Sequence, residues 1–271
     1  MSESAKVITI SNFKGGSGKT TGTAGLSYVL AQAGYKVLVI DFDPQADITF
    51  YLMPEYDSDE EEMTFFQAIQ AGDLFPVVKR AHPDHHLWLI PADLDLTGLS
   101  DFMYAKHPKD LRKRNRMIHE LVEPLRERFD FIFIDVPPTV SFATNNAFVA
   151  SDYIIISLQT QGSSFRATQK LIPEIRQLVD SLDIDLKVLG VMAIIHARLS
   201  SSDMKVLESA QDLFEDAMFE TIIQHRERIK AWGDTGITEN IHDRWDREAL
   251  EQFRNLAREV VERLQRIEVK N

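Results

Sequence analysis

Short apolar runs alternate with amphipathic segments along most of this chain. The runs are rich in β-branched and aromatic residues and stay apolar at successive positions, which is typical of parallel strands covered on both faces. The predicted strands are Val7–Ile10, Val37–Ile40, Leu87–Ile90, Phe131–Ile134, Tyr153–Ile156, Val188–Ile195 and Phe219–Ile223.

Segments with helical periodicity lie between these runs. The predicted helices are Thr20–Ala33, Lys109–Arg128, Ser164–Leu182, Ser202–Asp216 and Arg244–Arg266. Gly34 is a normal stop signal after the first of them. Residues 51–86 are expected to be irregular, with the acidic run 57–62 forming a solvated loop or a helix start. This alternation predicts an α/β fold: a doubly wound, mostly parallel sheet with helices on both faces, which binds ligands at the carboxyl ends of its strands.

Length and composition narrow this picture. The chain has 271 residues, 44% of them hydrophobic, and we expect a single domain over residues 1–271 without an N-terminal helix-turn-helix domain. The absence of cysteine excludes disulfides, thiolate metal sites and Fe–S clusters. No apolar stretch approaches the ~18 residues of a membrane span, and no signal segment opens the chain, so a cytoplasmic protein is expected. The net charge of −12 means that any contact with nucleic acid must come from a local basic patch.

A glycine-rich loop follows the first predicted strand. Its end fits the phosphate-binding pattern G-x-x-x-x-G-K-[ST], although Phe13 stands where the first glycine is usual. Glycines let backbone N–H groups surround a polyphosphate, and the following helix presents the positive end of its dipole. Lys19 would neutralise the β- and γ-phosphates, and the Thr20 hydroxyl would bind Mg²⁺. The predicted nucleotide-binding residues of this loop are Lys14, Gly15, Gly16, Ser17, Gly18, Lys19, Thr20 and Thr21.

Two further strand ends carry carboxylates in register with this loop. The second predicted strand leads into Asp41–Asp47 (DFDPQAD), and the fourth ends at Asp135. Carboxylates at strand ends beside a phosphate loop suit Mg²⁺ coordination, directly or through water. We therefore predict Thr20, Asp43 and Asp135 as the metal-binding residues, with Asp43 also orienting or activating the attacking water.

These segments resemble the ParA/MinD family of dimerising ATPases. Lys14, five positions before Lys19, matches the signature lysine of the family's deviant Walker A motif. DFDPQAD is similar to the family segment D-x-D-P-Q-G-N, and FDFIFIDVPP is similar to Y-D-F-I-I-I-D-x-P-P. The resemblance extends from Lys6 to at least Gly236. Asp47 and Gln224 depart from the family pattern, where asparagine and, near the adenine, proline are usual.

The resemblance implies a mechanism and a set of site residues. In this family the early lysine crosses into the partner subunit and touches the partner's nucleotide, so Lys14, Lys19 and Asp43 are expected to be catalytic. Asp135 corresponds to the Walker B aspartate, and Gln224 stands where the family contacts the adenine. ATP and Mg²⁺ are the implied cofactors, and the ATP-bound chain is expected to be a homodimer. No arginine finger is evident in the sequence, so slow basal turnover is expected.

Several branches of the family fit poorly. Nitrogenase iron proteins and arsenite-pump ATPases use cysteines, and related tyrosine kinases carry a tyrosine-rich tail, whereas the last tyrosine here is Tyr153. A MinD-like protein would need a basic amphipathic tail, but residues 246–271 hold six basic and six acidic side chains. A terminal helix packed on the sheet is the expected structure of this segment.

Contacts with DNA rest on the resemblance and on local charge. The resemblance places DNA-contacting side chains at Arg198, Arg228 and Lys230, and Lys106–Arg116 adds six basic residues against one aspartate. Aromatic interleaving is missing, so phosphate contacts without sequence specificity are expected. The cluster of His82, His85 and His86 is expected to be a surface feature, since one loop without further obvious ligands is a weak metal signal.

Two functions follow from these observations. The first is a nucleoid-associated partition ATPase, whose ATP-bound dimer binds nonspecific DNA and whose hydrolysis is stimulated by a ParB-like centromere-binding protein. The alternative is a MinD-like or cargo-positioning ATPase that acts on a membrane or a protein scaffold. The zero net charge of the tail favours the first.

Overall fold

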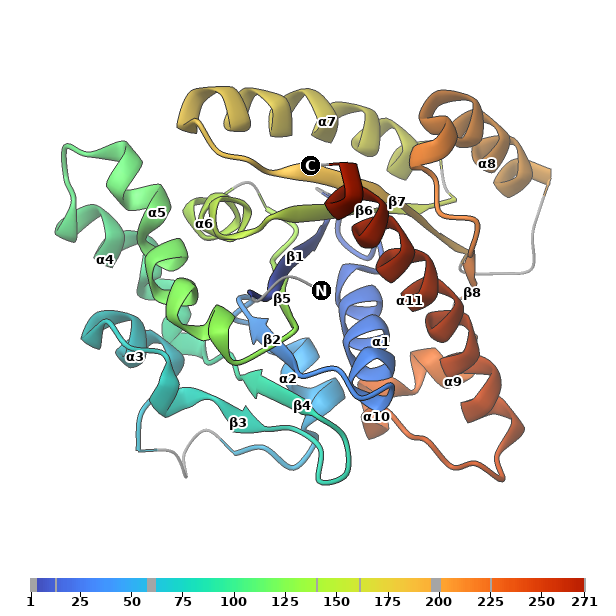
Figure 1. Cartoon of the computed structure of the whole chain (residues 1–271), viewed down its shortest axis with the longest axis horizontal. Coiled ribbons are helices and arrows are strands. Elements are labelled where there is room, and N and C mark those ends of the chain that lie inside the picture. The colour runs from blue at the N-terminus through green and yellow to red at the C-terminus, as the bar shows by residue number, and fades with distance from the viewer. Residues whose placement is uncertain are drawn as a thin grey trace.

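A single mixed sheet organises the computed structural model, which describes residues 4–12, 14–57, 62–139, 141–160, 162–195, 201–224 and 226–270. Within these ranges eight strands lie in the order β3-β4-β2-β5-β1-β6-β7-β8 (Figure 1). The strands are β1 Lys6–Ser11, β2 Val37–Asp41, β3 Lys79–Arg80, β4 Leu87–Ile90, β5 Phe131–Asp135, β6 Tyr153–Gln159, β7 Lys187–Ile195 and β8 Ile223–Gln224. The edge strand β3 is antiparallel to β4, and the other pairs are parallel. The mostly parallel sheet predicted from the sequence is confirmed.

Helices cover both faces of this sheet. They are α1 Lys19–Gln32, α2 Asp47–Leu52, α3 Phe65–Ala71, α4 Leu99–Lys106, α5 Leu111–Val122, α6 Phe142–Ala150, α7 Gly162–Leu182, α8 Ser201–Phe214, α9 Glu227–Lys230, α10 Trp232–Thr235 and α11 Arg244–Lys270. Short 3₁₀ helices span Phe75–Val77, Leu94–Gly98, Glu123–Glu127 and Glu215–Ala217. Helices α1 and α11 lie together on one face, while α3–α8 cover the other (Figure 1).

Alternate residues of each central strand enter different cores. In β5, Phe131 and Phe133 pack with the α1–α11 layer, whereas Ile132 and Ile134 pack with α3–α6. These four side chains are fully buried. A strand that is apolar at successive positions is therefore stable only between two helical layers, which explains the uninterrupted apolar runs in the sequence.

The region 51–86 is less irregular than expected. Helix α3 begins with a capping box in which Thr64 accepts the N–H of Gln67, and the Gln67 side chain accepts the N–H of Thr64. The 3₁₀ helix at Phe75–Val77 and strand β3 follow, so the expectation of irregular structure is wrong for these segments. The T-x-x-Q spacing of this box was present in the sequence as a start signal. Conversely, the strand expected at Phe219–Ile223 is reduced to β8.

The C-terminal helix α11 confirms the expectation of a packed terminal helix. Its apolar stripe, Leu250, Phe253, Leu256, Val260 and Leu264, is at most 3% exposed. Phe253 lies so close to α1 that a Cβ on Gly25 would come within 2.6 Å of its ring. Because the stripe is buried, it offers no free apolar face to a bilayer. None of the described helices combines the length and apolarity that crossing a membrane requires.

Candidate nucleotide-binding site

The predicted phosphate loop joins β1 to α1 at the carboxyl end of the sheet. Gly16 and Gly18 adopt positive φ angles of 68° and 83°, which favour glycine. A Cβ on Gly18 would also overlap Cδ1 of Ile194 in β7. Gly15 and Gly16 are exposed, and Gly18 is the N-cap of α1 without a side-chain cap. The loop thus presents backbone N–H groups at the positive end of the helix dipole.

Lys19, in the first turn of α1, lies across this loop. The side chain is 6% exposed, and its Nζ donates to the backbone carbonyl of Lys14 at 3.4 Å. Burial lowers the pKa of Lys19, while the charges of Asp135 and Asp43 oppose that shift. The ammonium group is therefore held among backbone dipoles and two carboxylates, where an anionic ligand would find a desolvated positive charge.

Asp135, at the end of β5, contacts threonine side chains near the start of α1. Its carboxylate accepts hydrogen bonds from Thr20 Oγ1 at 2.9 Å and from Thr23 Oγ1 at 3.3 Å. Burial raises the pKa of Asp135 to about 7, against the hydrogen bond from Thr20 and the charge of Lys19. A hydroxyl and a carboxylate in contact are hard oxygen donors suited to Mg²⁺, whose charge would favour the ionised aspartate.

The segment after β2 places two more carboxylates at this edge. Asp43 is half-buried and accepts the N–H of Gln45 at 3.1 Å. Asp41 is fully buried and accepts the N–H of Asp43 at 3.1 Å and both the N–H and the hydroxyl of Thr49. Burial, reinforced by the charge of Asp135, raises the pKa of Asp41 well above its usual value. We define the nucleotide edge as loop residues 14–18 with Lys19, Thr20, Asp41, Asp43 and Asp135.

Lys14 is held on the β6 side of the loop. Its Nζ donates to Oε1 of Gln159 at 3.0 Å, and its N–H donates to Oδ1 of Asn12 at 3.1 Å. The Asn12 amide in turn donates to the carbonyl of Ser157 at 2.6 Å and to Thr168 Oγ1 at 3.0 Å. Asn12 therefore fixes the start of the loop, while the Lys14 ammonium bonds within its own subunit.

The remaining predicted contacts are arranged differently. Ser17 is fully buried, and its hydroxyl bonds Ser157 Oγ at 3.1 Å, so only its backbone remains for a ligand. Thr21 is buried in α1 at 7% exposure. Gln224 is exposed at the end of β8, where its N–H donates to Gln252 at 2.7 Å. It shares the carboxyl edge of the sheet with the loop, but β6 and β7 separate β8 from β1.

The predicted DNA contacts near α9 are partly neutralised. The Arg228 guanidinium bonds Asp243 and, at 2.9 Å, Asp246, whose side chain is 2% exposed. Lys230 pairs with Glu227 at 2.6 Å in a more exposed contact. Arg198 lies outside the described residues. Arg228 therefore joins α9 to the start of α11, and a phosphate would have to compete with two carboxylates for it.

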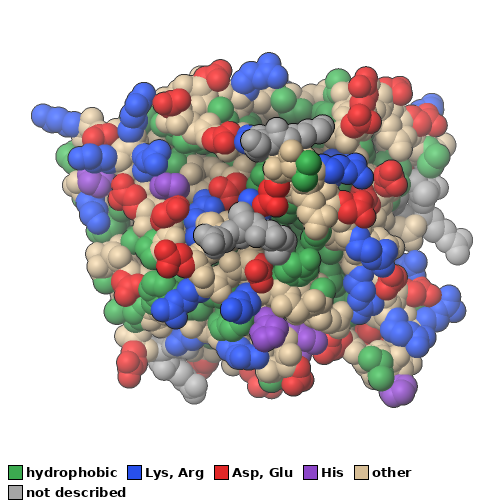
Figure 2. Space-filling view, in the orientation of Figure 1, with side chains coloured by type: hydrophobic (Ala, Val, Ile, Leu, Met, Phe, Trp, Pro, Cys, Tyr) green, Lys and Arg blue, Asp and Glu red, His purple; other side chains and the backbone are tan. Residues whose placement is uncertain are grey.

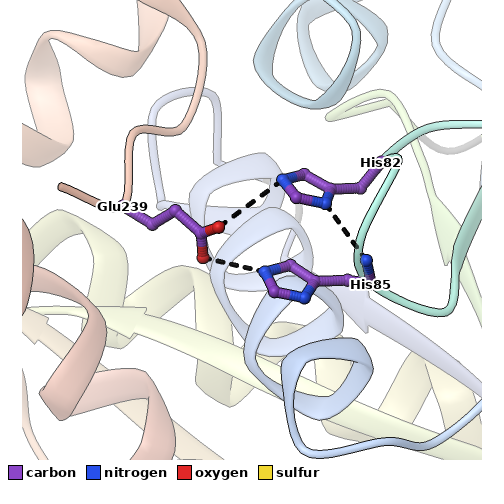
Figure 3. A group of neighbouring side chains, drawn as sticks. All are labelled: His82, His85 and Glu239. Carbon is purple, nitrogen blue, oxygen red and sulfur yellow. Dashed lines mark hydrogen bonds and ion pairs between the residues drawn. The ribbon is translucent and has the colours of Figure 1, made fainter. Parts of the chain in front are cut away.

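A polar cluster lies on the α1–α11 face, away from the nucleotide edge. Nε2 of His85 bonds Oε2 of Glu239 at 2.8 Å, and His82 Nε2 lies 3.7 Å from Oε1 (Figure 3). Gln32 also donates to Oε2 at 2.8 Å. Tyr28 contacts both imidazole rings edge-on, and burial and the charge of Glu239 raise its pKa. The expectation that these histidines are surface residues is wrong for His82 and His85, which are half-buried, whereas His86 is exposed.

The geometry of this cluster is that of a hydrogen-bonded clasp. The two imidazole rings stack at 4.1 Å with 9° between their planes, so their in-plane lone pairs run side by side rather than converging. Nδ1 of His82 accepts the N–H groups of Asp84 and His85, which leaves the ring proton on Nε2, the atom that faces Glu239 (Figure 3). A metal-bound histidine normally donates through its second nitrogen. The cluster therefore ties the β3–β4 loop to the segment before α11.

Comparisons with known proteins agree with the geometry of the nucleotide edge. The family model described as "AAA domain" matches residues 5–188. The sporulation initiation inhibitor protein Soj of Bacillus subtilis is 29% identical over 255 residues, which cover 94% of this chain and 98% of Soj. The chromosome partitioning protein ParA of Myxococcus xanthus is 28% identical over 260 residues, covering 95% of this chain and 88% of that protein. The chain belongs to the ParA-type family of partitioning ATPases.

A solved ParA-type fold matches most of the chain. The ATP complex of McdA from Cyanothece has a TM-score of 0.80 and 22% identity, and the match covers 96% of each chain. At this identity the likeness establishes the fold, which is the P-loop arrangement that the sequence predicted.

The sequence patterns do not predict every polar group that shapes the site of this ParA-type ATPase. Asp41 lies within DFDPQAD, where the sequence pattern predicts a role for Asp43 but not for Asp41. The sequence does carry a signal for Asp41, which is a charged residue at the end of a fully buried strand. A charge in such a place is costly unless hydrogen bonds or opposite charges compensate it. Gln159 and Asn12 gave no local signal, since Gln159 meets Lys14 over a separation of 145 residues. These groups hold the loop and the segment after β2, on which the predicted catalytic residues lie.

Proposed function

We propose that this ParA-type ATPase binds ATP with Mg²⁺, dimerises in that state and hydrolyses ATP slowly to ADP and phosphate. The observation that carries the proposal is the meeting of Lys19, Thr20 and Asp135 under a glycine loop that also bears Lys14. The resemblance gives Lys14 a contact with the nucleotide of a second subunit, in addition to the contact that Lys19 makes in its own. A second copy of the chain gives it a function.

The chain's own residues account for the chemical step. Bound Mg²⁺ would supply positive charge to the β- and γ-phosphates. Lys19 and the loop N–H groups would bind and orient those phosphates, and Thr20 and Asp135 would hold the metal. Asp43 positions the attacking water in line with the bond to be broken, while Asp41 keeps the Asp43 backbone in place through its hydrogen bond. Lys14 of the second subunit stabilises the charge that develops on the phosphates.

Dimerisation requires a local change at Lys14. Its ammonium bonds Gln159 of the same subunit, and this hydrogen bond has to break before the side chain can reach a partner's nucleotide. The exchange replaces a hydrogen bond from the ammonium to a neutral amide by a contact between two opposite charges, ammonium and phosphate, which adds Coulomb attraction. Nucleotide in the partner therefore favours the crossed conformation.

Variants of Lys14 and Asp43 test this proposal. Lys14→Ala should retain nucleotide binding and lose the ATP-dependent dimer, because Lys19 and the loop backbone stay in place while the contact across the interface is removed. Asp43→Ala should bind ATP and dimerise but release no phosphate above background. Light scattering with ATP or ADP and a phosphate-release assay measure both. An undiminished dimer of Lys14→Ala, or normal phosphate release by Asp43→Ala, contradicts the assigned roles.

We further propose that the ATP-bound dimer partitions plasmid or chromosomal DNA in the cytoplasm. Its relatives include proteins named for chromosome partitioning, and the resemblance brings nonspecific DNA and a ParB-like centromere-binding protein as partners. Retention of unrelated duplex DNA on filters, with ATP against ADP and at low and high salt, tests this function. Retention that requires ATP and falls with salt supports it. Sedimentation with anionic vesicles without DNA retention would favour the MinD-like alternative.

A further inference from the structure

A group of exposed cations lies on α4 and α5, far along the chain from the nucleotide loop. We define the α4–α5 face as Lys106, Lys109, Arg112, Lys113 and Arg116. All five side chains are exposed, and Figure 2 shows Lys and Arg side chains gathered where Figure 1 places α4 and α5. Segment 106–116 contains six basic residues and one acidic residue in a chain whose net charge is −12. The local charge thus has the opposite sign to that of the whole chain.

Among the described residues, these cations lack the carboxylate partners that other basic residues have. Across the described ranges, none of the five forms an ion pair with a carboxylate within 4.0 Å, and Lys106 lies over the Phe102 ring. The sole acidic residue of the segment, Asp110, caps α5 by accepting the N–H of Lys113 at 3.0 Å. The Asp110 carboxylate therefore stabilises the N-terminus of α5 rather than pairing with a cation of the face. By contrast, exposed arginines of α11 are paired, such as Arg244 with Glu248 at 2.6 Å.

The helix beneath the cations is firmly attached to the core. Met117, Ile118 and Val122 of α5 are at most 5% exposed, and Asn146 of α6 donates to the backbone carbonyl of Arg114 at 2.9 Å. The half-buried Arg114 itself lies over the Tyr104 ring at 4.9 Å. The face therefore presents charge from a helix whose main apolar side is already packed. Two large apolar side chains beside it are exposed, Tyr104 of α4 at 57% and Leu111 of α5 at 51%, and Arg114 covers the Tyr104 ring. They do not form the continuous apolar side with which an amphipathic helix enters a lipid bilayer.

A row of long cationic side chains on one helix, without carboxylate partners in the described part of the chain, suits a regular array of phosphates. Long Lys and Arg side chains can each meet a backbone phosphate without reading a base, and such contacts release counterions and depend steeply on salt. We propose that the α4–α5 face binds the phosphate backbone of duplex DNA without sequence specificity. The proposal rests on the DNA-binding function proposed above and assigns that function to a surface other than the ion-paired region around Arg228.

A matched pair of triple variants tests the assignment. One variant combines Arg112→Gln, Lys113→Gln and Arg116→Gln on α5; the control combines Arg244→Gln, Arg258→Gln and Arg266→Gln on α11. Both remove three exposed cations, so they change the total charge equally. Filter retention of a random-sequence duplex is measured with ATP over a range of salt concentrations, together with ATP-dependent light scattering and phosphate release.

The expected result separates local charge from total charge. Each lost phosphate contact lowers the slope of log affinity against log salt by about 0.9, so the α5 variant should lose between about two and three units of slope. Its affinity at ~0.1 M salt should fall roughly tenfold or more, whereas the α11 control should stay within about twofold of the unmodified chain. Dimerisation and hydrolysis should be unchanged in both variants.

Each other outcome contradicts the proposal in a distinguishable way. Equal losses in both triple variants would assign DNA binding to total charge, and full retention by the α5 variant would move the interface elsewhere. If the unmodified chain hydrolyses ATP but retains no DNA, the DNA-binding function itself fails. Sedimentation with vesicles of equal parts phosphatidylglycerol and phosphatidylcholine, lost only in the α5 variant, would reassign the face to a membrane.

Discussion

Charged side chains at the nucleotide edge and on the α4–α5 face have opposite surroundings. At the edge, Lys19, Asp41 and Asp135 are at most 6% exposed, and each is hydrogen-bonded to backbone or hydroxyl groups. On the α4–α5 face the cations are exposed and lack carboxylate partners among the described residues. A charge interaction is several times stronger in the protein interior than in water. At the nucleotide edge a single charged residue can therefore have a large effect. On the α4–α5 face only the combined charge of several residues can.

This difference predicts different responses to salt and to substitution. Buried charges at the edge are little screened, so one substitution there should remove a function at any ionic strength. Exposed cations are screened within about 8 Å at physiological salt, so their effects should be additive, modest and sensitive to ionic strength. The region around Arg228 is intermediate, because this arginine is partly exposed but pairs with the buried Asp246.

Lys19→Ala is expected to have the largest effect. It removes the buried ammonium that neutralises the phosphates, and losing one partner of a desolvated charge pair costs about 2–5 kcal/mol. Nucleotide affinity should fall by roughly a hundredfold or more, below detection by calorimetry at ordinary concentrations. Lys113→Ala is the control, since it removes an equal charge from the exposed face and should bind ATP normally. If nucleotide affinity fell equally in the two variants, the predicted difference between buried charges at the nucleotide edge and exposed charges on the α4–α5 face would be wrong.

Arg228→Ala should have the next largest effect, on stability rather than on nucleotide binding. It leaves Asp246, 2% exposed, without its cationic partner while Thr238 and Asn240 still bond the carboxylate. Breaking a largely buried pair in this way should lower the free energy of unfolding by about 2–3 kcal/mol. Urea unfolding followed by circular dichroism measures this.

Lys230→Ala is the matched control for that experiment. Its exposed pair with Glu227 should contribute less than about 1 kcal/mol. A stable Arg228→Ala protein that has lost DNA retention would instead place Arg228 with the functional cations of the α4–α5 face.

Acidification should weaken the metal-dependent part of nucleotide binding. Because burial raises the pKa of Asp135 to about 7, this carboxyl takes up a proton as the pH falls below that value. Mg²⁺ then competes with the proton, and its contribution to ATP affinity should fall by up to about tenfold per pH unit below 7. The stability of the metal-free protein should depend on pH in the opposite direction to its ATP affinity. The raised pKa of Asp135 favours the folded state at low pH, and this stabilisation is lost as the pH rises through about 7.

Calorimetric titrations with and without Mg²⁺ between about pH 6 and pH 8 measure this dependence. Asp135→Asn is the control, because the titration of ATP itself remains in that variant while the carboxyl does not. An equal pH dependence in both proteins would mean that Asp135 titrates outside the neutral range.

Sequence patterns predicted the fold and the centre of the site, because both depend on local order. Strand, glycine loop and helix follow one another directly, and Asp135 ends a continuous apolar run, so Lys19, Thr20 and Asp135 could be placed together from sequence alone. Side-chain pairings across long separations left no such signal. His85 meets Glu239 over 154 residues, and Lys14 meets Gln159 over 145. Similarly, the pattern on α5 showed basic residues but not whether carboxylates would pair with them.

Arg112→Gln is expected to have the smallest effect, and its sign is the informative part. Arg112 and Arg116 are four residues apart on α5, where like charges repel by a few tenths of a kcal/mol. Neutralising one should therefore raise the free energy of unfolding by up to about 0.5 kcal/mol at low salt, and the gain should vanish near 1 M salt, where screening acts within about 3 Å. Arg244→Gln on α11, which breaks a pair with Glu248 instead, should stabilise nothing. Urea unfolding at both salt concentrations measures the difference. A loss of stability in Arg112→Gln would mean that this arginine has a carboxylate partner in solution, and the face would then resemble the region around Arg228.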